Sequence, residues 1–310
     1  GEIVATVNGA GYTSLASALA NANDGDTVKL LTDTTLMQMA IDKGITLDLG
    51  GNTLTISFDS SGTSALGIQF TSGTSTVING IIDDTRTTVT GYTGFISVYA
   101  ANKGTSLTLI DVTIKQYIPD RTDTYNYAVR ADNGAYLAVS KNVQILEHSR
   151  ADVADTAGVV GITLIGNGTD TTTLVVDGAT INTTGFAITG NGSDGYGNTD
   201  ITIENVTINA YATAIYHPQY GKITVNGGTI ESEAGAGLVL CAGELTVNGG
   251  NFITNATGPI TAGDSGHELM PSAIVVDDSI GYPGATQGLK ATIEGGSFTS
   301  ADEVPAVIVY

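Results

Sequence analysis

The chain has 310 residues and carries 11 Lys and Arg against 31 Asp and Glu, which gives a formal net charge of −20. This excess of negative charge argues against electrostatic binding to nucleic acids or anionic membranes, because both need a basic surface. The single cysteine, Cys241, excludes a disulfide within the chain, and its apolar neighbours predict a buried, inert thiol. The sequence shows no signal peptide and no transmembrane segment, so it predicts no membrane insertion.

The first predicted element is a short capping helix over residues 13–23. Thr13-Ser14 suits the N-cap position, because a hydroxyl oxygen can accept a hydrogen bond from the first turn. The residues that follow place one apolar stripe along the helix: Leu15, Ala18, Leu19 and Ala22. Gly25 is expected just past the helix end, where a left-handed conformation is common. We therefore expect residues 1–26 to form an N-terminal cap.

From residue 27 onward the sequence repeats one phrase, in which a strand, a two-residue corner and a second strand follow one another. The clearest copies are 223–230, 245–252 and 291–298, and a looser copy is 47–54. Each corner is built from Asn, Glu and Gly residues such as Asn226-Gly227-Gly228, and Asn and Gly tolerate positive φ. A supersecondary unit that recurs at a fixed period is typical of a solenoid.

The period follows from the apolar residue that opens the second strand of each phrase. The shortest steps, from Ile208 to Ile230 and from Ile230 to Phe252, are both 22 residues. Longer steps then represent one coil with an inserted loop, and the step from Phe252 to Phe298 represents two coils or one coil with large insertions. The series is Leu54, Ile82, Ile114, Ile145, Ile181, Ile208, Ile230, Phe252 and Phe298.

A third strand is expected before each next phrase, since Val, Ile, Leu and Thr alternate with polar residues there. Three strands in about 22 residues predict an all-β fold, a single-stranded parallel β-helix of about ten coils. Residues 27–310 would form these coils, and residues 1–310 a single domain. An antiparallel sandwich is the alternative, but it would not preserve the phrase. The expected third strands are 65–70, 94–100, 127–132, 158–165, 186–189, 213–216, 237–242, 272–276 and 306–310.

The N-terminal cap followed by Gly25-Asp26-Thr27 resembles the pectin-lyase-like superfamily of right-handed parallel β-helices. The resemblance covers nearly the whole chain, but it is one of pattern. It implies the fold and leaves the activity open, since the superfamily includes lyases, hydrolases and non-catalytic surface proteins. At the other end, 307–310 is an apolar strand with nothing after it, and we expect the natural protein to continue beyond Tyr310.

The candidate site residues lie in two loops that interrupt consecutive coils, after Ile114 and after Ile145. Both loops leave the same strand of their coils, so they are expected to lie side by side, with Arg130 on the strand between them. Carboxylates beside Arg would suit a Ca²⁺-assisted lyase, a glycan or protein contact, or a network of surface ion pairs. The candidates are Tyr117, Asp120, Arg121, Asp123, Tyr125, Arg130, Glu147, His148, Arg150 and Asp152.

Other motifs carry weaker signals. Asn198-Thr199-Asp200 resembles the start of a polygalacturonase motif, but the partner aspartates are missing, so Asp200 is predicted to be a turn residue. Asp83-Asp84 and Asp277-Asp278 supply too few oxygens for a complete Ca²⁺ site. No cofactor is therefore expected, and Ca²⁺ is the one cofactor that these residues suggest. The aromatic cluster at 216–220 is predicted to be a corner packed by its own rings rather than a sugar-binding surface.

The sequence favours a non-catalytic, adhesin-like module of a secreted or cell-surface bacterial protein. Its partner would be a polysaccharide or a host or cell-surface protein, bound through the loops that interrupt the coils. The alternative is a polysaccharide lyase or glycoside hydrolase with its site on the 117–155 loops. A subunit of a trimeric fibre is a third hypothesis, although a monomer is favoured.

Overall fold

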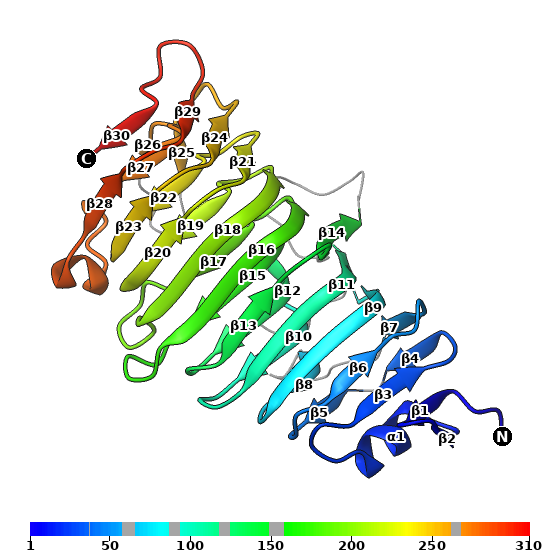
Figure 1. Ribbon diagram of the computed structural model, residues 1–310. Coiled ribbons are helices and arrows are strands. Elements are labelled where there is room, and N and C mark those ends of the chain that lie inside the picture. Colours follow the sequence, from blue (N-terminus) through cyan, green and yellow to red (C-terminus); the bar gives the residue numbers. More distant parts are fainter. Residues whose placement is uncertain (37, 58–65, 87–93, 118–124, 149–157, 262–267) are drawn as a thin grey trace.

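Nearly all the regular structure of the protein is β-strand. The computed structural model describes residues 1–36, 38–57, 66–86, 94–117, 125–148, 158–261 and 268–310. The strands stack side by side from the N-terminal end to the C-terminal end of an elongated molecule (Figure 1). No helix in these ranges has the length and apolarity needed to cross a membrane.

The N-terminal end is capped by a hairpin and a short helix. Strands β1 (Ala5–Val7) and β2 (Ala10–Tyr12) pair antiparallel, and β1 also pairs antiparallel with β3 (Thr27–Leu30). Helix α1 (Leu15–Asn21) has Ser14 as its N-cap and buries Leu15, Ala18 and Leu19, as predicted. The predicted helix end was wrong, because the C-cap is the extended residue Ala22 and Gly25 lies farther on, in the turn before β3.

Two of the three strands of each predicted coil lie in one large sheet. These strands form two rows, one on each side of a corner of the coil. Four long strands bend through this corner and contribute to both rows, so the two rows form one continuous sheet. Neighbours within each row pair parallel. The first row is β3, β6 (Thr46–Asp48), β9 (Thr74–Asp84), β11 (Ser106–Tyr117), β13 (Tyr136–Val139), β16 (Thr172–Thr183), β18 (Thr199–Ala210), β20 (Gly221–Val225), β23 (Glu244–Val247) and β28 (Lys290–Ile293). The second row is β4 (Thr34–Leu36), β7 (Thr53–Ile56), the carboxyl halves of β9 and β11, β14 (Gln144–His148), the carboxyl halves of β16 and β18, β21 (Thr229–Ser232), β24 (Asn251–Thr254) and β29 (Ser297–Thr299).

The third strands form a separate ten-stranded parallel sheet whose spatial order follows the chain. Every third strand expected from the sequence has a counterpart here, with ends shifted by up to two residues. The sequence missed only the first strand, β5. The order is β5 (Met39–Ile41), β8 (Leu66–Phe70), β10 (Ile96–Ala101), β12 (Tyr125–Asp132), β15 (Gly158–Ile165), β17 (Ile188–Gly190), β19 (Ile215–His217), β22 (Leu238–Leu240), β27 (Ile274–Val276) and β30 (Val307–Val309). Large parallel sheets traced in this order fit a parallel β-helix.

The inward side chains stack in ladders that make one continuous apolar core. The predicted series from Leu54 to Phe298 is confirmed as one of these ladders, because each member is the register partner of the next. Phe252 pairs directly with Phe298, and their rings stack with centroids 5.5 Å apart. The 46-residue step is therefore one coil with large insertions.

The inserted loops concentrate at one corner, between the second row and the ten-stranded sheet. The connections across this corner are short in three consecutive coils, where they span 184–187, 211–214 and 233–237. They are longer on both sides, spanning 118–124 and 149–157 before these coils and 255–273 after them. The short connections therefore lie between coils that carry long ones.

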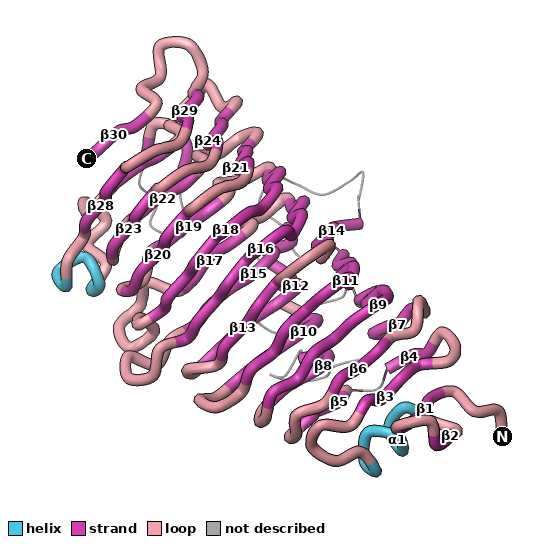
Figure 2. Tube along the Cα trace, in the orientation of Figure 1, coloured by secondary structure: helices cyan, strands magenta, loops and turns pink. Residues whose placement is uncertain are grey.

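The segment after β24 builds a second, smaller apolar cluster on the outer face of the ten-stranded sheet. It contains the antiparallel pair β25 (Ile260–Thr261) and β26 (Glu268–Leu269), and the 3₁₀ helix η2 (Pro283–Gln287) follows β27 near the C-terminal end (Figure 2). The cluster includes Tyr216, Val239 and Val275, which point outward from neighbouring strands. These outward apolar residues are buried because the insertion packs on them.

Candidate functional site

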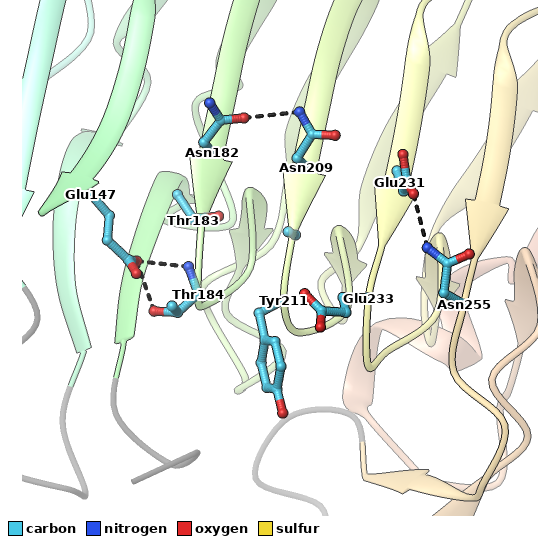
Figure 3. Close-up of a pocket in the computed structure, with 10 residues that line it drawn as sticks. Glu147, Asn182, Thr183, Thr184, Asn209, Tyr211, Glu231, Glu233 and Asn255 are labelled. Atoms are coloured by element: carbon cyan, nitrogen blue, oxygen red, sulfur yellow. Dashed lines mark hydrogen bonds between the residues drawn. The ribbon is translucent and has the colours of Figure 1, made fainter. Parts of the chain in front are cut away.

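An open polar pocket of about 620 Å³ lies over the three short connections (Figure 3). Its residues come from the carboxyl ends of β14, β16, β18, β21 and β24 and the positions that follow them. Because these strands are successive neighbours in one row, the pocket extends along the direction in which the coils stack. We call it the polar pocket; its lining is Glu147, Asn182, Thr183, Thr184, Asn209, Ala210, Tyr211, Glu231, Glu233 and Asn255.

Backbone hydrogen bonds carry the parallel ladder past the strand ends and fix the floor of the pocket. The amide of Tyr211 donates to the carbonyl of Thr183 at 2.9 Å, and the amide of Ala234 donates to the carbonyl of Tyr211 at 2.8 Å. The amide of Asn255 donates to the carbonyl of Ser232 at 3.0 Å. The side chains that follow each strand are therefore held at the spacing of the coils, about 4.8 Å.

Amide and carboxylate side chains are linked to one another across the coils. Asn209 Nδ2 donates to Asn182 Oδ1 at 3.0 Å, and Asn255 Nδ2 donates to Glu231 Oε1 at 2.8 Å. Asn182, Asn209 and Glu231 are consecutive register partners on the outer face of the sheet. These bonds orient the polar groups before any ligand arrives, which reduces the ordering cost of binding.

Glu147 lies at one end of the polar pocket and is held by the next coil. Its Oε2 accepts hydrogen bonds from the backbone amide and the hydroxyl of Thr184, both at 2.7 Å (Figure 3). Burial raises the pKa of Glu147 above its ordinary value, although the bonds from Thr184 act in the opposite direction. The pocket therefore contains a partly desolvated carboxyl group in a fixed position.

Tyr211 is the aromatic residue of the polar pocket. It lies between Thr184 and Glu233 in Figure 3, and 37 % of its surface is exposed. An exposed ring beside amides and carboxylates can stack on the apolar face of a sugar while the polar groups bind its hydroxyls. The polar pocket therefore provides a stacking surface and hydrogen-bonding groups for a hydroxyl-rich ligand.

The structure brings some of the sequence-predicted candidates together. Tyr117 and His148 are register partners at the ends of β11 and β14, so the two candidate loops do leave from adjacent positions. Glu147 lines the polar pocket. Tyr125, on β12, stacks on Phe186 with ring centroids 6.4 Å apart. The other candidates Asp120, Arg121, Asp123, Arg150 and Asp152 lie outside the described residues, and for His148 only the backbone is described.

Arg130 belongs to a different group on the ten-stranded sheet. Its Nε and Nη2 donate to the two carboxylate oxygens of Asp132 at 2.8 and 2.7 Å, and its guanidinium lies 5.9 Å from the ring centre of Tyr99. The hydroxyl of Tyr99 also donates to Asp132, and burial raises the pKa of Tyr99 to about 12. Arg130 is thus engaged in a bidentate ion pair, the strongest geometry for such a pair.

One carboxylate of each acidic pair considered for Ca²⁺ accepts hydrogen bonds from protein donors. Asp84 is fully buried and accepts two hydrogen bonds from the Arg86 guanidinium, at 2.8 and 2.7 Å. Ser97 and Gln116 also donate to Asp84, at 2.9 and 3.1 Å. Asp277 is buried and accepts from the Ser279 amide. Within the described ranges, no group of three His, Cys, Asp or Glu side chains gathers around a possible metal position.

Two other sequence predictions have clear outcomes. Asp200 is a strand residue of β18, in register with Lys222, so the prediction of a turn residue was wrong. The 216–220 corner is packed, as predicted, but by rings from elsewhere: Phe186 stacks on Tyr216 at 5.1 Å, and the Tyr216 and Tyr282 hydroxyls lie 2.8 Å apart. A distant insertion supplies Tyr282, which the sequence could not place.

Sequence reasoning missed most of the polar pocket because it searched the long loops. A signal was present, since the residues that follow the second strand of each phrase are polar in the coils with short connections. Parallel register stacks these positions into one surface. No family model, curated protein or solved structure matches the chain.

Proposed function

We propose that the chain is a non-catalytic glycan-binding module of a secreted or cell-surface protein, of the adhesin-like kind, and that the polar pocket is its binding site. We further propose that the fold is a right-handed, single-stranded parallel β-helix of about ten coils, of the pectin-lyase-like type. The parallel three-strand pattern and the helical N-terminal cap support this assignment. We also propose that the protein acts as a monomer.

The observation that carries the proposal is the composition of the polar pocket. An exposed tyrosine stands among three asparagines and three glutamates, and hydrogen bonds across the coils hold the asparagines, Glu147 and Glu231. Sugar-binding sites combine an aromatic surface with several polar groups that fix orientation. A rigid site of this kind costs little ordering entropy on binding.

The position of the polar pocket in the fold also supports a binding function. The polar pocket lies at the corner where the long connections leave the coils. Connecting segments on a rigid scaffold commonly carry binding functions. The acidic composition, the Thr- and Asn-rich strands and the regular coils support a secreted or cell-surface location.

A polysaccharide lyase or glycoside hydrolase is the second candidate, and one observation favours it. Glu147 is a fixed carboxyl group with a raised pKa, a property that general acids share. Hydrolysis also needs a second carboxyl group across the scissile bond. Glu231 accepts a hydrogen bond from Asn255. Glu231 lies on β21 and Glu233 directly follows it, three strands from β14. The geometry therefore supports binding more strongly than hydrolysis.

Substitution of the aromatic residue tests the proposal. Binding of a panel of oligosaccharides would be measured by calorimetry for the wild type and for Tyr211→Ala. We expect at least a tenfold loss of affinity for the ligand that binds, because the stacking surface is removed while the fold is unchanged. Tyr220→Ala is the matched control, since Tyr220 is equally exposed, at 38 %, and lies outside the pocket.

The same samples separate the two candidate functions. Unsaturated products, followed by absorbance, and new reducing ends would reveal lyase or hydrolase activity. Turnover lost in Glu147→Gln would establish the enzyme and remove the proposal of a non-catalytic module. Equal affinities for wild type and Tyr211→Ala would remove the polar pocket as the site.

A further inference from the structure

We propose that the glycan bound in the polar pocket carries protonated amino groups, as a linear polymer of glucosamine units does, and lies along the stacking direction of the coils. This inference rests on the proposed glycan-binding function and adds the chemical class of the ligand. It excludes polyuronates and sulfated glycans as ligands of this pocket.

The first argument is the balance of hydrogen-bonding groups. A carboxylate only accepts hydrogen bonds, and three of the lining residues are glutamates. Among the bonds between lining residues, Glu147 and Glu231 each use one oxygen. Glu233 is exposed and lies beside Tyr211 (Figure 3). The pocket therefore presents more acceptors than donors, which suits a ligand rich in donors.

The second argument is charge. None of the described residues that line the pocket is Lys, Arg or His. The chain as a whole carries a formal charge of −20, so the potential around the molecule attracts cations and repels polyanions. A carboxylate or sulfate of a ligand would meet glutamates without a compensating cation, and this juxtaposition is costly. An ammonium group would instead form charge-assisted hydrogen bonds with them.

The third argument is the position of the tyrosine between the carboxylates. Glu147 and Glu233 come from opposite sides of Tyr211 along the pocket (Figure 3). An aromatic face attracts a cation, and it also stacks on the ring of a sugar. One unit stacked on Tyr211 would therefore place the amines of its neighbours near glutamates.

The fourth argument is shape. The positions Thr184, Tyr211, Glu233 and Asn255 follow one another on consecutive coils, so they span roughly 14 Å at the strand spacing. A chain of a few sugar units that lies across the strands can contact all four. A single small cation would use only one end of the pocket.

Calorimetric titrations with four hexasaccharides at pH 6 and low salt test the inference. The ligands are a glucosamine hexamer, its fully N-acetylated form, a neutral glucose hexamer and a galacturonate hexamer. We expect the amine-bearing hexamer to bind at least tenfold more tightly than the acetylated and neutral ones, and the galacturonate hexamer not to bind.

Because an acidic protein attracts any polycation, binding in the polar pocket must be distinguished from attraction by the net charge. Glu231→Gln/Glu233→Gln should lower the affinity for the amine-bearing hexamer at least tenfold, to that for the acetylated one. Glu244→Gln/Glu294→Gln is the control, since it removes two charges at exposed positions outside the pocket. This control should change the affinity less than twofold. The single variant Glu233→Gln repeats the test at an exposed residue that the fold does not need.

Each outcome decides one of the two proposals. If the acetylated or neutral hexamer binds as tightly as the amine-bearing one, the inference fails while the glycan-binding function stands. If both double variants lose the same affinity, attraction is non-specific and the inference fails. If no hexamer binds in the pocket, the proposed function fails with it.

Discussion

At the scale of the residue, one strongly perturbed group is a buried histidine at the carboxyl end of β19. His217 is 1 % exposed, and its Nδ1 donates to the carbonyl of Ala242 at 3.0 Å. Its Nε2 is buried and has no hydrogen-bond partner among the described residues. Burial lowers the pKa of His217 to about 4, because the charged ring would lose its hydration.

This lowered pKa predicts a loss of stability in mild acid. The unfolded chain binds a proton at His217 below about pH 6.5, whereas the folded protein binds it only near pH 4. Relative to His217→Gln, the free energy of unfolding of the wild type should therefore fall by about 3 kcal/mol between pH 6.5 and 4. Denaturant titrations of both proteins across this range measure the difference, in which the contributions of the carboxylates cancel. A difference independent of pH would show that His217 titrates normally.

The single cysteine shows the same influence of burial. Cys241 is 1 % exposed, and burial together with the charge of Asp277 raises the pKa of its thiol to about 12. A thiol in this state is a poor nucleophile at neutral pH. The sequence prediction of a buried thiol is thereby confirmed, and Cys241 has no part in the proposed site.

At the scale of the element, the capping helix illustrates how a short segment is stabilised. Helix α1 has seven residues, too few for independent stability, so it depends on its cap and on the core beneath it. Ser14 Oγ accepts a hydrogen bond from the Ser17 amide at 3.1 Å. Lys43 Nζ donates to the carbonyls of Leu19 and Ala22, at 3.1 and 2.6 Å, and so closes the other end.

Removing the cap should therefore weaken the N-terminal end. Ser14→Ala is expected to lower the free energy of unfolding by about 1 kcal/mol, because the Ser17 amide loses its acceptor. Hydrogen exchange of the amides in α1 would measure the local effect. Ser14→Asp is the control, since aspartate is an equally good N-cap. Equal exchange in Ser14→Ala and the wild type would show that the cap contributes nothing.

The N-terminal hairpin was missed in the sequence although its signal was present. Asn8-Gly9 separates two short strands, and both residues have positive φ, 47° and 92°. An Asn-Gly pair between strands is the strongest local indication of a two-residue hairpin turn. An antiparallel pair is not part of the parallel repeat, so the period of the repeat does not indicate this hairpin.

At the scale of the whole molecule, stability comes from contacts between neighbouring coils. The inward ladder that contains Ile208 continues from coil to coil, and most of its members have no exposed surface. In a solenoid each repeat contacts only its neighbours, so a defect in the middle weakens two interfaces.

A cavity in the central ladder should therefore be costly. Ile208→Ala is expected to lower the free energy of unfolding by about 2 to 5 kcal/mol, because the removed methylene groups leave a gap that the sheet cannot close. Unfolding by guanidinium measures this change in the free energy of unfolding. Thr207→Ala is the matched control on the same strand, since Thr207 is exposed and points outward. Similar midpoints for the two variants would contradict a packed core at this position.

The sequence by itself determined the parallel architecture, the ladder from Leu54 to Phe298 and the helical cap, because each follows from local periodicity and parallel register. Only the tertiary structure decided the site. The polar pocket joins residues that are up to 108 positions apart in the chain, from Glu147 to Asn255. The burial of Tyr216 and Asp84 was equally invisible in the sequence, since it depends on an insertion and on partners from other strands. Parallel register places equivalent positions of successive repeats side by side, so these contacts follow from the sequence. The packing of insertions on the repeat depends on the three-dimensional path of the chain.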